Sequence, residues 1–321
     1  MTLGGKGGGE KSDDEGKPQT MLLLQFAGWS SAVDPSFWHK IAELKLNRMH
    51  LSEKEIECES EFHMSRNDGV DVPMFVNGGN VFADEDDANG VYGGKNDKND
   101  GIIGCWRARG DAMNFNVKER LFEMKPNEEA KRIGQDLLDA MKTMDTDVVV
   151  NRLNTFRVFM HADLKKWKFF YWFFFPSVMF APHEFVEKRS GDEEETLCGN
   201  ENAKSRAECM KSWLDKPQSD FAWCVETVRK ENSTYVSSNH ALSKFMELCK
   251  DVTLIEGGTD RTLEICFVDT ATGDAPSISL LNVLTFLDVR FQRTKPIDVA
   301  CIRANNKGIF EFKTCLFLKQ V

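Results

Sequence analysis

Cys105 and His240 are the two residues whose types and spacing come closest to a catalytic pair. Cys105 is followed by Trp, and His240 lies about 135 residues downstream, within the range of papain-like cysteine hydrolases. In such enzymes the imidazole keeps the thiol deprotonated at neutral pH, which makes the sulfur a nucleophile. However, the oxyanion-hole Gln and the Asn-Ser-Trp that follows the histidine in that family are absent, and Arg107 and Arg109 follow the Trp. A cysteine hydrolase using Cys105 and His240 is therefore kept only as an alternative function.

Other patterns that carry catalysis or bind cofactors are missing from the sequence. There is no Gly-x-Ser-x-Gly elbow, no His-Glu-x-x-His and no Cys-x-x-Cys pair. The glycine-rich run at residues 4–9 contains Lys6 but lacks the Gly-Lys-Ser/Thr that follows a strand in phosphate loops. The acidic run at residues 84–87 lacks the register of a calcium loop. We expect no catalytic residue, no cofactor-binding residue and no metal ligand in this chain.

The composition is that of a folded protein with an acidic surface. Hydrophobic residues make up 41% and charged residues 29%, and the net charge is −10, from 51 Asp and Glu against 41 Lys and Arg. This balance argues against a nucleic-acid-binding protein, because phosphate contacts require a basic face. The longest apolar segment, at residues 169–182, is too short for a membrane span. Acidic residues 13–15 precede the apolar run at 21–27, which argues against a signal peptide, so we expect a cytoplasmic protein with reduced cysteines.

The hydrophobic pattern predicts the elements that position any site. A polar tail at residues 1–20 is expected to be disordered, and one folded domain is expected over 21–321, with acidic insertions at 83–101 and 188–206. Asp34 and Pro35 are typical of a helix N-cap and first helical position, and the helix continues with Phe37, Trp38, Ile41 and Leu44. Further helices are predicted over 127–144, 147–156, 219–228, 237–248 and 277–291, and strands over 22–26, 263–268, 299–303 and 309–317. Because strands and helices are interleaved, the fold class is mixed α/β (α+β).

The stretch from His161 to Pro176 is the most informative part of the sequence. Asp163 is placed to cap a short helical turn that carries Lys165 and Lys166 at the surface. Residues 169–175 are all aromatic, and so apolar a run predicts a central strand buried on both faces. Pro176 is expected to end that strand.

The same stretch resembles the signature of a known family. The N-terminal domain of autophagy-related protein 7, the ubiquitin-like modifier-activating (E1-like) enzyme of autophagy, carries Phe-Ala-Asp-Leu-Lys-Lys-Tyr-Lys-Phe-Tyr-Tyr-Trp-Phe-aromatic-Phe-Pro, and residues 161–176 are similar to it. Residues 26–39 resemble the opening block of that domain, and residues 309–313 resemble its closing strand. The matching signature residues, most of which we expect to be structural, include Asp34, Phe37, Trp38, Asp163, Leu164, Lys165, Lys166, Tyr171, Trp172 and Pro176.

The resemblance implies both a fold and a function. In this family the N-terminal domain recruits the conjugating enzymes that accept the modifier, and a C-terminal domain binds ATP, adenylates the modifier, carries the catalytic cysteine and dimerises. It therefore implies a non-catalytic, monomeric docking module that binds conjugating enzymes through a flexible segment and meets the modifiers only indirectly. ATP is expected only for the C-terminal adenylation domain, which we expect to be absent from this chain. The implied location is the cytoplasm, with recruitment to the pre-autophagosomal structure.

The physical mode of docking and the status of the chain stay open. A flexible, partly helical segment of the partner would fit a hydrophobic cleft with charged rims, and the acidic chain would suit a basic partner. The family's Pro-Leu-Arg-Asn-Phe motif is replaced by Ser-Leu-Leu-Asn-Val at residues 279–283, so a scaffold that has lost docking is a further alternative. The chain could be a fragment of a complete activating enzyme or a stand-alone domain, and the position of the docking groove is not assigned.

Overall fold

The structure, a computed structural model, describes residues 26, 31–65, 74–82, 102–178, 184–188, 201–214, 221–230, 234–252, 261–269, 271, 276–291, 297–304 and 310–318. The predicted tail at residues 1–20, the predicted insertion at 83–101 and the predicted strand at 22–26, apart from Phe26, lie outside these residues. The predicted insertion at 188–206 is wrong at both ends, because Lys188 belongs to a strand and Glu201 begins a helix.

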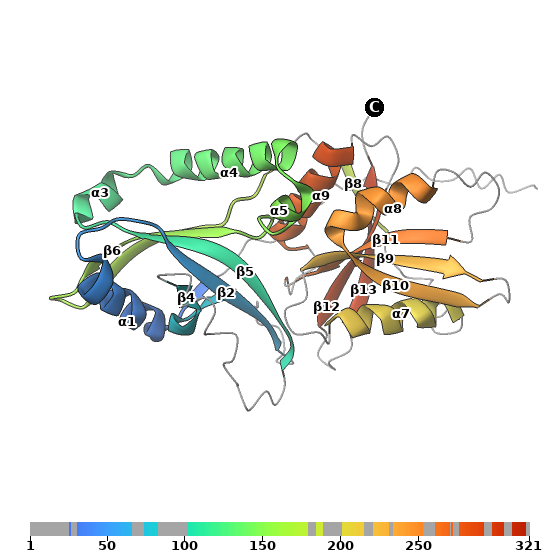
Figure 1. Ribbon diagram of the computed structural model, residues 1–321, viewed down its shortest axis with the longest axis horizontal. Helices are drawn as coiled ribbons and strands as arrows, with labels where there is room; N and C mark the ends of the chain where they lie inside the picture. Colours follow the sequence, from blue (N-terminus) through green and yellow to red (C-terminus); the bar gives the residue numbers. More distant parts are fainter. Residues whose placement is uncertain are drawn as a thin grey trace, which may run out of the picture.

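The N-terminal half is built on a sheet that has seven strands within the described residues. They are β1 (Ser31–Val33), β2 (Ile56–Ser65), β3 (Met74–Val76), β4 (Val81–Phe82), β5 (Ile102–Asn114), β6 (Phe156–Asp163) and β7 (Lys168–Phe174). Their order is β1-β3-β2-β5-β6-β7, with β4 paired to β2, and the β1–β3 and β5–β6 pairs are parallel. Helix α1 (Pro35–Leu44) lies on one face, and α3 (Lys118–Glu123) and α4 (Pro126–Thr143) run over the other (Figure 1).

The C-terminal half is built on a second sheet, of six strands in the described part of the chain. Its strands are β8 (Glu184–Lys188), β9 (Ala222–Arg229), β10 (Tyr235–Ala241), β11 (Arg261–Val268), β12 (Ile297–Ala304) and β13 (Phe310–Leu318), in the order β10-β9-β11-β12-β13-β8. Helix α7 (Glu201–Leu214) covers one face, and α8 (Phe245–Val252) and α9 (Ile278–Phe291) lie on the other (Figure 1). The mixed α/β class is confirmed, and β11, α9, β12 and β13 match predicted elements.

Helix α1 begins where its sequence predicts. The Asp34 side chain accepts a hydrogen bond from the backbone N–H of Ser36 at 2.8 Å, and proline occupies the first helical position. Phe37, Ile41 and Leu44 are buried against the sheet, as their spacing requires. The helix continues as a π-helical turn over Lys45–Met49.

Helices α4 and α5 differ in how well the sequence predicts their ends. The predicted helix at 127–144 is confirmed as α4, although Lys125 occupies the N-cap position and proline follows it. Helix α5 covers only Thr146–Val150, so the predicted helix at 147–156 is too long. Asp145 starts α5 by accepting the backbone N–H of Asp147 at 3.0 Å, and β6 already begins at Phe156.

The predicted helices at 219–228 and 237–248 are wrong over most of their length. Residues 222–229 form β9 and residues 235–241 form β10, and only the end of the second segment is helical, in α8. Strand β9 is covered on one face by α7, where Trp223 stacks on Trp213 at 5.6 Å. A strand covered on both faces carries a nearly continuous apolar run, which periodicity alone does not distinguish from a buried helix.

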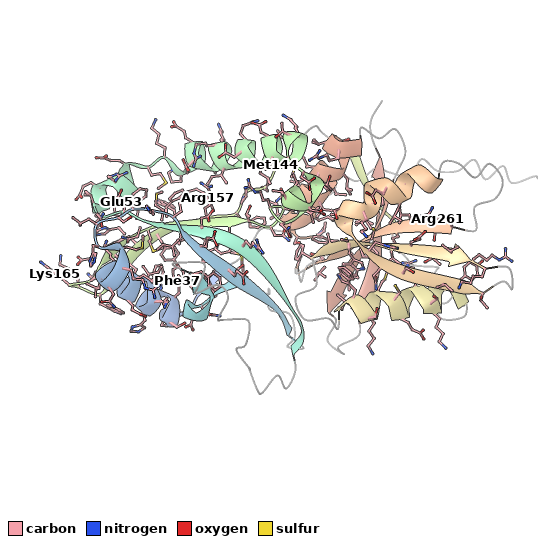
Figure 2. The ribbon with its side chains drawn as sticks, viewed as in Figure 1. Phe37, Glu53, Met144, Arg157, Lys165 and Arg261 are labelled. Carbon is pink, nitrogen blue, oxygen red and sulfur yellow. The ribbon has the colours of Figure 1, made fainter. Side chains whose placement is uncertain are left out.

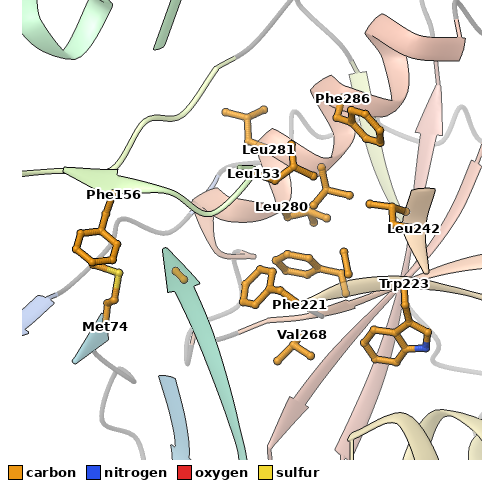
Figure 3. Close-up of a cluster of buried hydrophobic side chains, with 14 of the residues drawn as sticks. Met74, Leu153, Phe156, Phe221, Trp223, Leu242, Val268, Leu280, Leu281 and Phe286 are labelled. Carbon is orange, nitrogen blue, oxygen red and sulfur yellow. The ribbon is translucent and has the colours of Figure 1, made fainter. Parts of the chain in front are cut away.

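One hydrophobic core extends through both halves. Figure 3 shows Phe156 and Met74 at the first sheet and Leu280 and Leu281 of α9 nearer the second. All four belong to the same cluster of buried side chains. The segment after β7 joins this core, because Val178 belongs to the same cluster and Pro176 and Val178 are hydrogen-bonded to Asn282 of α9.

Candidate functional site

The long aromatic signature folds as a β-hairpin at the outer end of the first sheet. β6 and β7 pair antiparallel from Arg157 and Phe174 to Asp163 and Lys168, with a turn between them. Figure 2 places Lys165 at the tip, on the side of the first sheet that faces away from the second. The hairpin is thus the part of the first half that projects furthest from the junction.

Asp163 holds the turn, much as its sequence position predicts. Its Oδ1 and its main-chain oxygen both accept the backbone N–H of Lys166, at 3.3 and 3.2 Å, and Lys166 Nζ lies 3.8 Å from Oδ2. Trp167 closes the turn with a φ of 51°, a left-handed conformation that is unusual for a bulky residue. Its ring packs on His39 at 4.9 Å and on Phe169 at 5.1 Å, and these contacts hold the turn in one shape.

The prediction of a central strand buried on both faces is wrong for β7. β7 is the last strand of its sheet and, among the described strands, pairs with β6 alone. Tyr171 is 46% exposed and Trp172 is 41% exposed, whereas Phe174 is 9% exposed. The all-aromatic composition of residues 169–175 does not require burial on both faces, because aromatic side chains of an edge strand can be half-covered by helices on both faces and by one another.

One face of β7 packs against α1. Trp38 stacks on Phe169, with ring centroids 4.8 Å apart, and lies 5.1 Å from the ring of Tyr171. Phe37, next to Trp38, is fully buried, and its ring meets that of Trp38 edge to face at 5.0 Å. The fold thereby brings together two predicted signature residues, Trp38 and Tyr171, that are far apart in the sequence.

The opposite face of β7 packs against α3. Phe122 is 56% exposed and meets Phe170 edge to face at 5.6 Å. The ammonium of Lys118 lies 4.0 Å from the centre of the Phe170 ring and 5.0 Å from that of Phe122, a cation–π arrangement. Phe122 and Lys118 were not predicted as site residues, because about 47 residues separate Phe122 from the start of the aromatic run and no local pattern links the two segments.

Glu53 anchors α3 in this position. Its carboxylate accepts the backbone N–H of Asn116 at 2.8 Å and pairs with the guanidinium of Arg120. The hydrogen bond from Asn116 and the pairing with Arg120 lower the pKa of the Glu53 carboxyl, although partial burial opposes the shift. The ionised carboxylate of Glu53 therefore holds α3 over β7.

We call the rings around β7 the aromatic edge and define it as the exposed Phe122, Trp167, Tyr171 and Trp172 together with the half-buried Trp38. Basic side chains gather at the turn end of the aromatic edge. Residues 163–175 contain three lysines and one aspartate, and Lys165, Lys166 and Lys168 are all exposed. The hairpin is thus locally basic in a chain whose net charge is −10, while α3 beside it carries the exposed Glu119 and Glu123.

Comparison with known proteins assigns the chain to a family. The family model described as "Ubiquitin-like modifier-activating enzyme ATG7 N-terminus" matches residues 24–320. The chain belongs to this ATG7 N-terminal family. The resemblance read from the sequence is thereby confirmed.

Full-length ATG7 proteins are longer than the matched region. The ubiquitin-like modifier-activating enzyme atg7 of Dictyostelium discoideum is 25% identical over 292 residues, which cover 88% of this chain and 38% of the relative. ATG7 of Sordaria macrospora is 26% identical over 307 residues, which cover 87% and 39%. The chain thus spans less than half the length of these relatives.

Solved ATG7 N-terminal domains share the fold. The Kluyveromyces marxianus Atg7NTD–Atg10 complex gives a TM-score of 0.53 at 19% identity and covers 91% of this chain and 87% of that chain. The Kluyveromyces marxianus Atg7NTD alone gives 0.51 at 18% identity, with 92% and 90% covered.

The remaining ATG7 signature residues lie at the cap, the turn and the junction. Asp34 caps α1, Leu164 is half-buried in the hairpin turn, and Pro176 follows β7 where the chain enters the core. The Pro176 carbonyl accepts a hydrogen bond from Asn282, which stands at the Asn of the family's Pro-Leu-Arg-Asn-Phe motif. Leu280 and Asn282 therefore keep two of the five residues of that motif, and both side chains are fully buried.

The structure gives the Cys105–His240 pair no support. Cys105 lies on β5, opposite His63, and His240 lies on β10 of the other sheet. The ring nitrogen Nε2 of His240 is 3.1 Å from a carboxylate oxygen of Glu226. Burial raises the pKa of the Cys224 thiol to about 12, so this neighbour of His240 is also no nucleophile.

The described residues show neither a metal centre nor a membrane span. Within them, no group of three or more His, Cys, Asp and Glu side chains is placed to hold a metal ion. No helix in the same part of the chain is long and apolar enough to cross a membrane.

Proposed function

We propose that this chain is the non-catalytic module of an autophagy modifier-activating enzyme that recruits conjugating enzymes for modifier transfer in autophagosome formation. The observation that carries the proposal is the shared fold with an Atg7 N-terminal domain solved in complex with Atg10, over most of both chains. Family membership over residues 24–320 supports the same function.

The aromatic edge is the part of this fold best suited to a partner. Trp167 at 49%, Tyr171 at 46% and Trp172 at 41% are large apolar side chains left exposed at the far end of the first sheet. Clustered aromatic side chains on a surface mark sites of protein interaction, because a partner removes their apolar area from water.

The division of labour follows from the proposed module. The chain itself binds no ATP and supplies no catalytic cysteine, and both belong to an adenylation domain outside it. The chain meets the ubiquitin-like modifiers only through its partners. It acts as a monomer in the cytoplasm and reaches the pre-autophagosomal structure with those partners.

Isothermal titration calorimetry of the full chain with the Atg10-type conjugating enzyme of the same organism tests the proposal. We expect a dissociation constant in the micromolar range or tighter, about −8 kcal/mol or more favourable, and the same value with and without ATP and Mg²⁺. Deletion of the flexible segment of the conjugating enzyme should abolish the heat of binding. Absence of binding by the intact partner would contradict the proposal and leave a scaffold that has lost docking.

A thiol-reactive activity probe tests the hydrolase alternative in parallel. We expect labelling of Cys105 to be the same in the wild-type chain and in His240→Ala, because the two residues lie on different sheets. Labelling of Cys105 that disappears in the variant would reinstate the alternative.

A further inference from the structure

Among the described strands, β7 is the last of its sheet and has one edge without a strand partner. In the described part of the chain its one strand neighbour is β6, and the register between them is continuous from Asp163 to Phe174 without a bulge. The backbone N–H and C=O groups of alternate β7 residues therefore point away from the sheet. Such groups form a template for one more strand.

Within the strand itself, β7 lacks the features that usually block strand addition. Proteins protect edge strands with charged side chains, proline, a bulge or a very short strand. β7 is seven residues long, its one charged residue is Lys168 at the start, and the proline at 176 lies beyond its end. The six residues 169–174 between these points are all aromatic. An edge left so unprotected is a liability unless a partner covers it.

Side chains on both faces of the edge are placed to contact an added strand. Tyr171 and Trp172 are consecutive, so they point to opposite faces, and both are more than a third exposed. Trp38 extends the surface on the side of Tyr171, and Phe122 extends it beyond Phe170 on the other. A strand added about 4.8 Å away would place side chains over both rings.

The charges select the chemistry of the partner segment. Lys165, Lys166 and Lys168 stand at the turn end of the edge, and Lys118 lies over Phe170. The described acidic side chain in this hairpin, Asp163, is already engaged with the turn. An acidic segment would be attracted here despite the net charge of −10 of the chain.

We propose that β7 accepts an extended, acidic segment of the conjugating enzyme as an additional strand. Backbone hydrogen bonds to the free edge supply affinity, and apolar side chains of the segment cover Tyr171 and Trp172. Acidic side chains of the segment meet Lys165, Lys166 and Lys168. The inference rests on the proposed docking function and assigns its surface and ligand chemistry. It differs from the helix-in-cleft mode expected from the sequence, because an open strand edge is what the hairpin offers.

Hydrogen exchange of the wild-type chain, followed by NMR or mass spectrometry with and without the conjugating enzyme, tests strand addition directly. We expect amides of alternate residues within Lys168–Phe174 to become at least tenfold slower to exchange when the partner is bound, because their N–H groups enter a new ladder. Protection of β7 that rises with the concentration of the chain alone would assign the edge to a second copy and overturn the inference.

Two variants with matched controls test the side chains by calorimetry. The double variant Lys165→Glu, Lys166→Glu should weaken binding at least tenfold at low salt and less at high salt. The control Lys204→Glu, Lys211→Glu on α7 makes the same charge change away from the edge and should leave binding unchanged. Trp172→Ala should weaken binding at least tenfold, and Val236→Ala, which removes a side chain of nearly equal exposure (41% and 40%), should not.

The outcomes separate this inference from the docking function. Wild-type binding with unchanged β7 exchange and unaffected edge variants would overturn strand addition and leave the docking function standing. No binding of the partner by the wild-type chain would overturn both. Binding to vesicles of phosphatidylcholine and phosphatidylserine through the same lysines, with β7 exchange unchanged by the conjugating enzyme, would assign the edge to a membrane and overturn the inference.

Discussion

Replacing Asn282 with leucine should cost more stability than any other single polar substitution at the junction of the two sheets. The Asn282 side chain is fully buried. Its Nδ2 donates to the carbonyls of Leu153 and Pro176 at 2.9 and 2.8 Å, and its Oδ1 accepts the N–H of Val178 at 3.0 Å. One amide therefore pairs three backbone groups from two different segments.

The loss of stability follows from the backbone groups that leucine would leave without a hydrogen-bond partner. Each buried backbone group left unpaired costs about 1–3 kcal/mol, so three groups at the lower end of that range cost about 3 kcal/mol. Because leucine has a similar volume, it adds only a small packing change. We expect a loss of about 3–5 kcal/mol for Asn282→Leu. Thr285→Val is the matched control, since it removes one hydrogen bond, from Oγ1 to the Val178 carbonyl at 2.6 Å, and should cost about 1–2 kcal/mol.

Urea unfolding followed by far-UV circular dichroism and tryptophan fluorescence measures both variants. If the junction couples the two sheets, Asn282→Leu should also separate the fluorescence and circular dichroism transitions, because each half would begin to unfold alone. A loss below about 1 kcal/mol for Asn282→Leu, or a loss no larger than that of Thr285→Val, would refute the reasoning.

Three further changes have expected outcomes. The hydrogen bonds from Ser36 lower the pKa of the Asp34 carboxyl in the folded chain. The contribution of Asp34 to stability is therefore present above the ordinary carboxyl pKa and is lost as pH falls through the folded value. On acidification the stability of the wild type should fall relative to that of Asp34→Asn, and parallel curves of stability against pH would contradict this. Gly110→Ala should destabilise by about 1–3 kcal/mol in thermal unfolding, because a Cβ there would lie 2.4 Å from the Phe156 ring, and Phe156→Leu should partly compensate; an unchanged melting temperature would contradict the clash. Cys224, whose pKa burial raises to about 12, should remain unmodified by iodoacetamide at pH 8 in mass spectrometry of the native chain, and rapid alkylation would show that the thiol is accessible.

The sequence predicts an element well where one local signal sets both its start and its buried face. Helix α1 has an N-cap at Asp34 and a buried stripe at Phe37 and Ile41, so its position follows from residues within ten positions. Strand β9 has no such signal, because helices cover both of its faces and Trp223 and Cys224, on opposite faces, are equally buried. Its type is decided by pairing with β10 and β11, which a local pattern does not contain.

The candidate site shows the same limit at a larger scale. The signature predicts that Trp38, Tyr171 and Trp172 belong to one family pattern, and the exposure of Lys165 and Lys166 is confirmed. Whether the aromatic run is central or at an edge depends on the strand order. That order is set by the helical crossover that places β6 parallel to β5, and β7 then pairs with β6 on the outer side. The net charge misleads in a similar way, because an acidic total says nothing of where the lysines gather.

Asn282→Leu also tests whether docking at the aromatic edge is local. The hairpin is held by the rings of α1 on one face and by α3 on the other. Asn282 instead pairs with Leu153 ahead of β6 and with Pro176 and Val178 beyond β7, at the end of the hairpin opposite the turn. Under conditions where the variant remains folded, its affinity for the conjugating enzyme should therefore stay within about twofold of the wild type, less than about 0.4 kcal/mol. Calorimetry of the variant measures this directly, with Trp172→Ala as the change that should weaken binding. A tenfold loss of affinity in Asn282→Leu would mean that binding also depends on the arrangement of the two sheets. The edge alone would then no longer account for recognition.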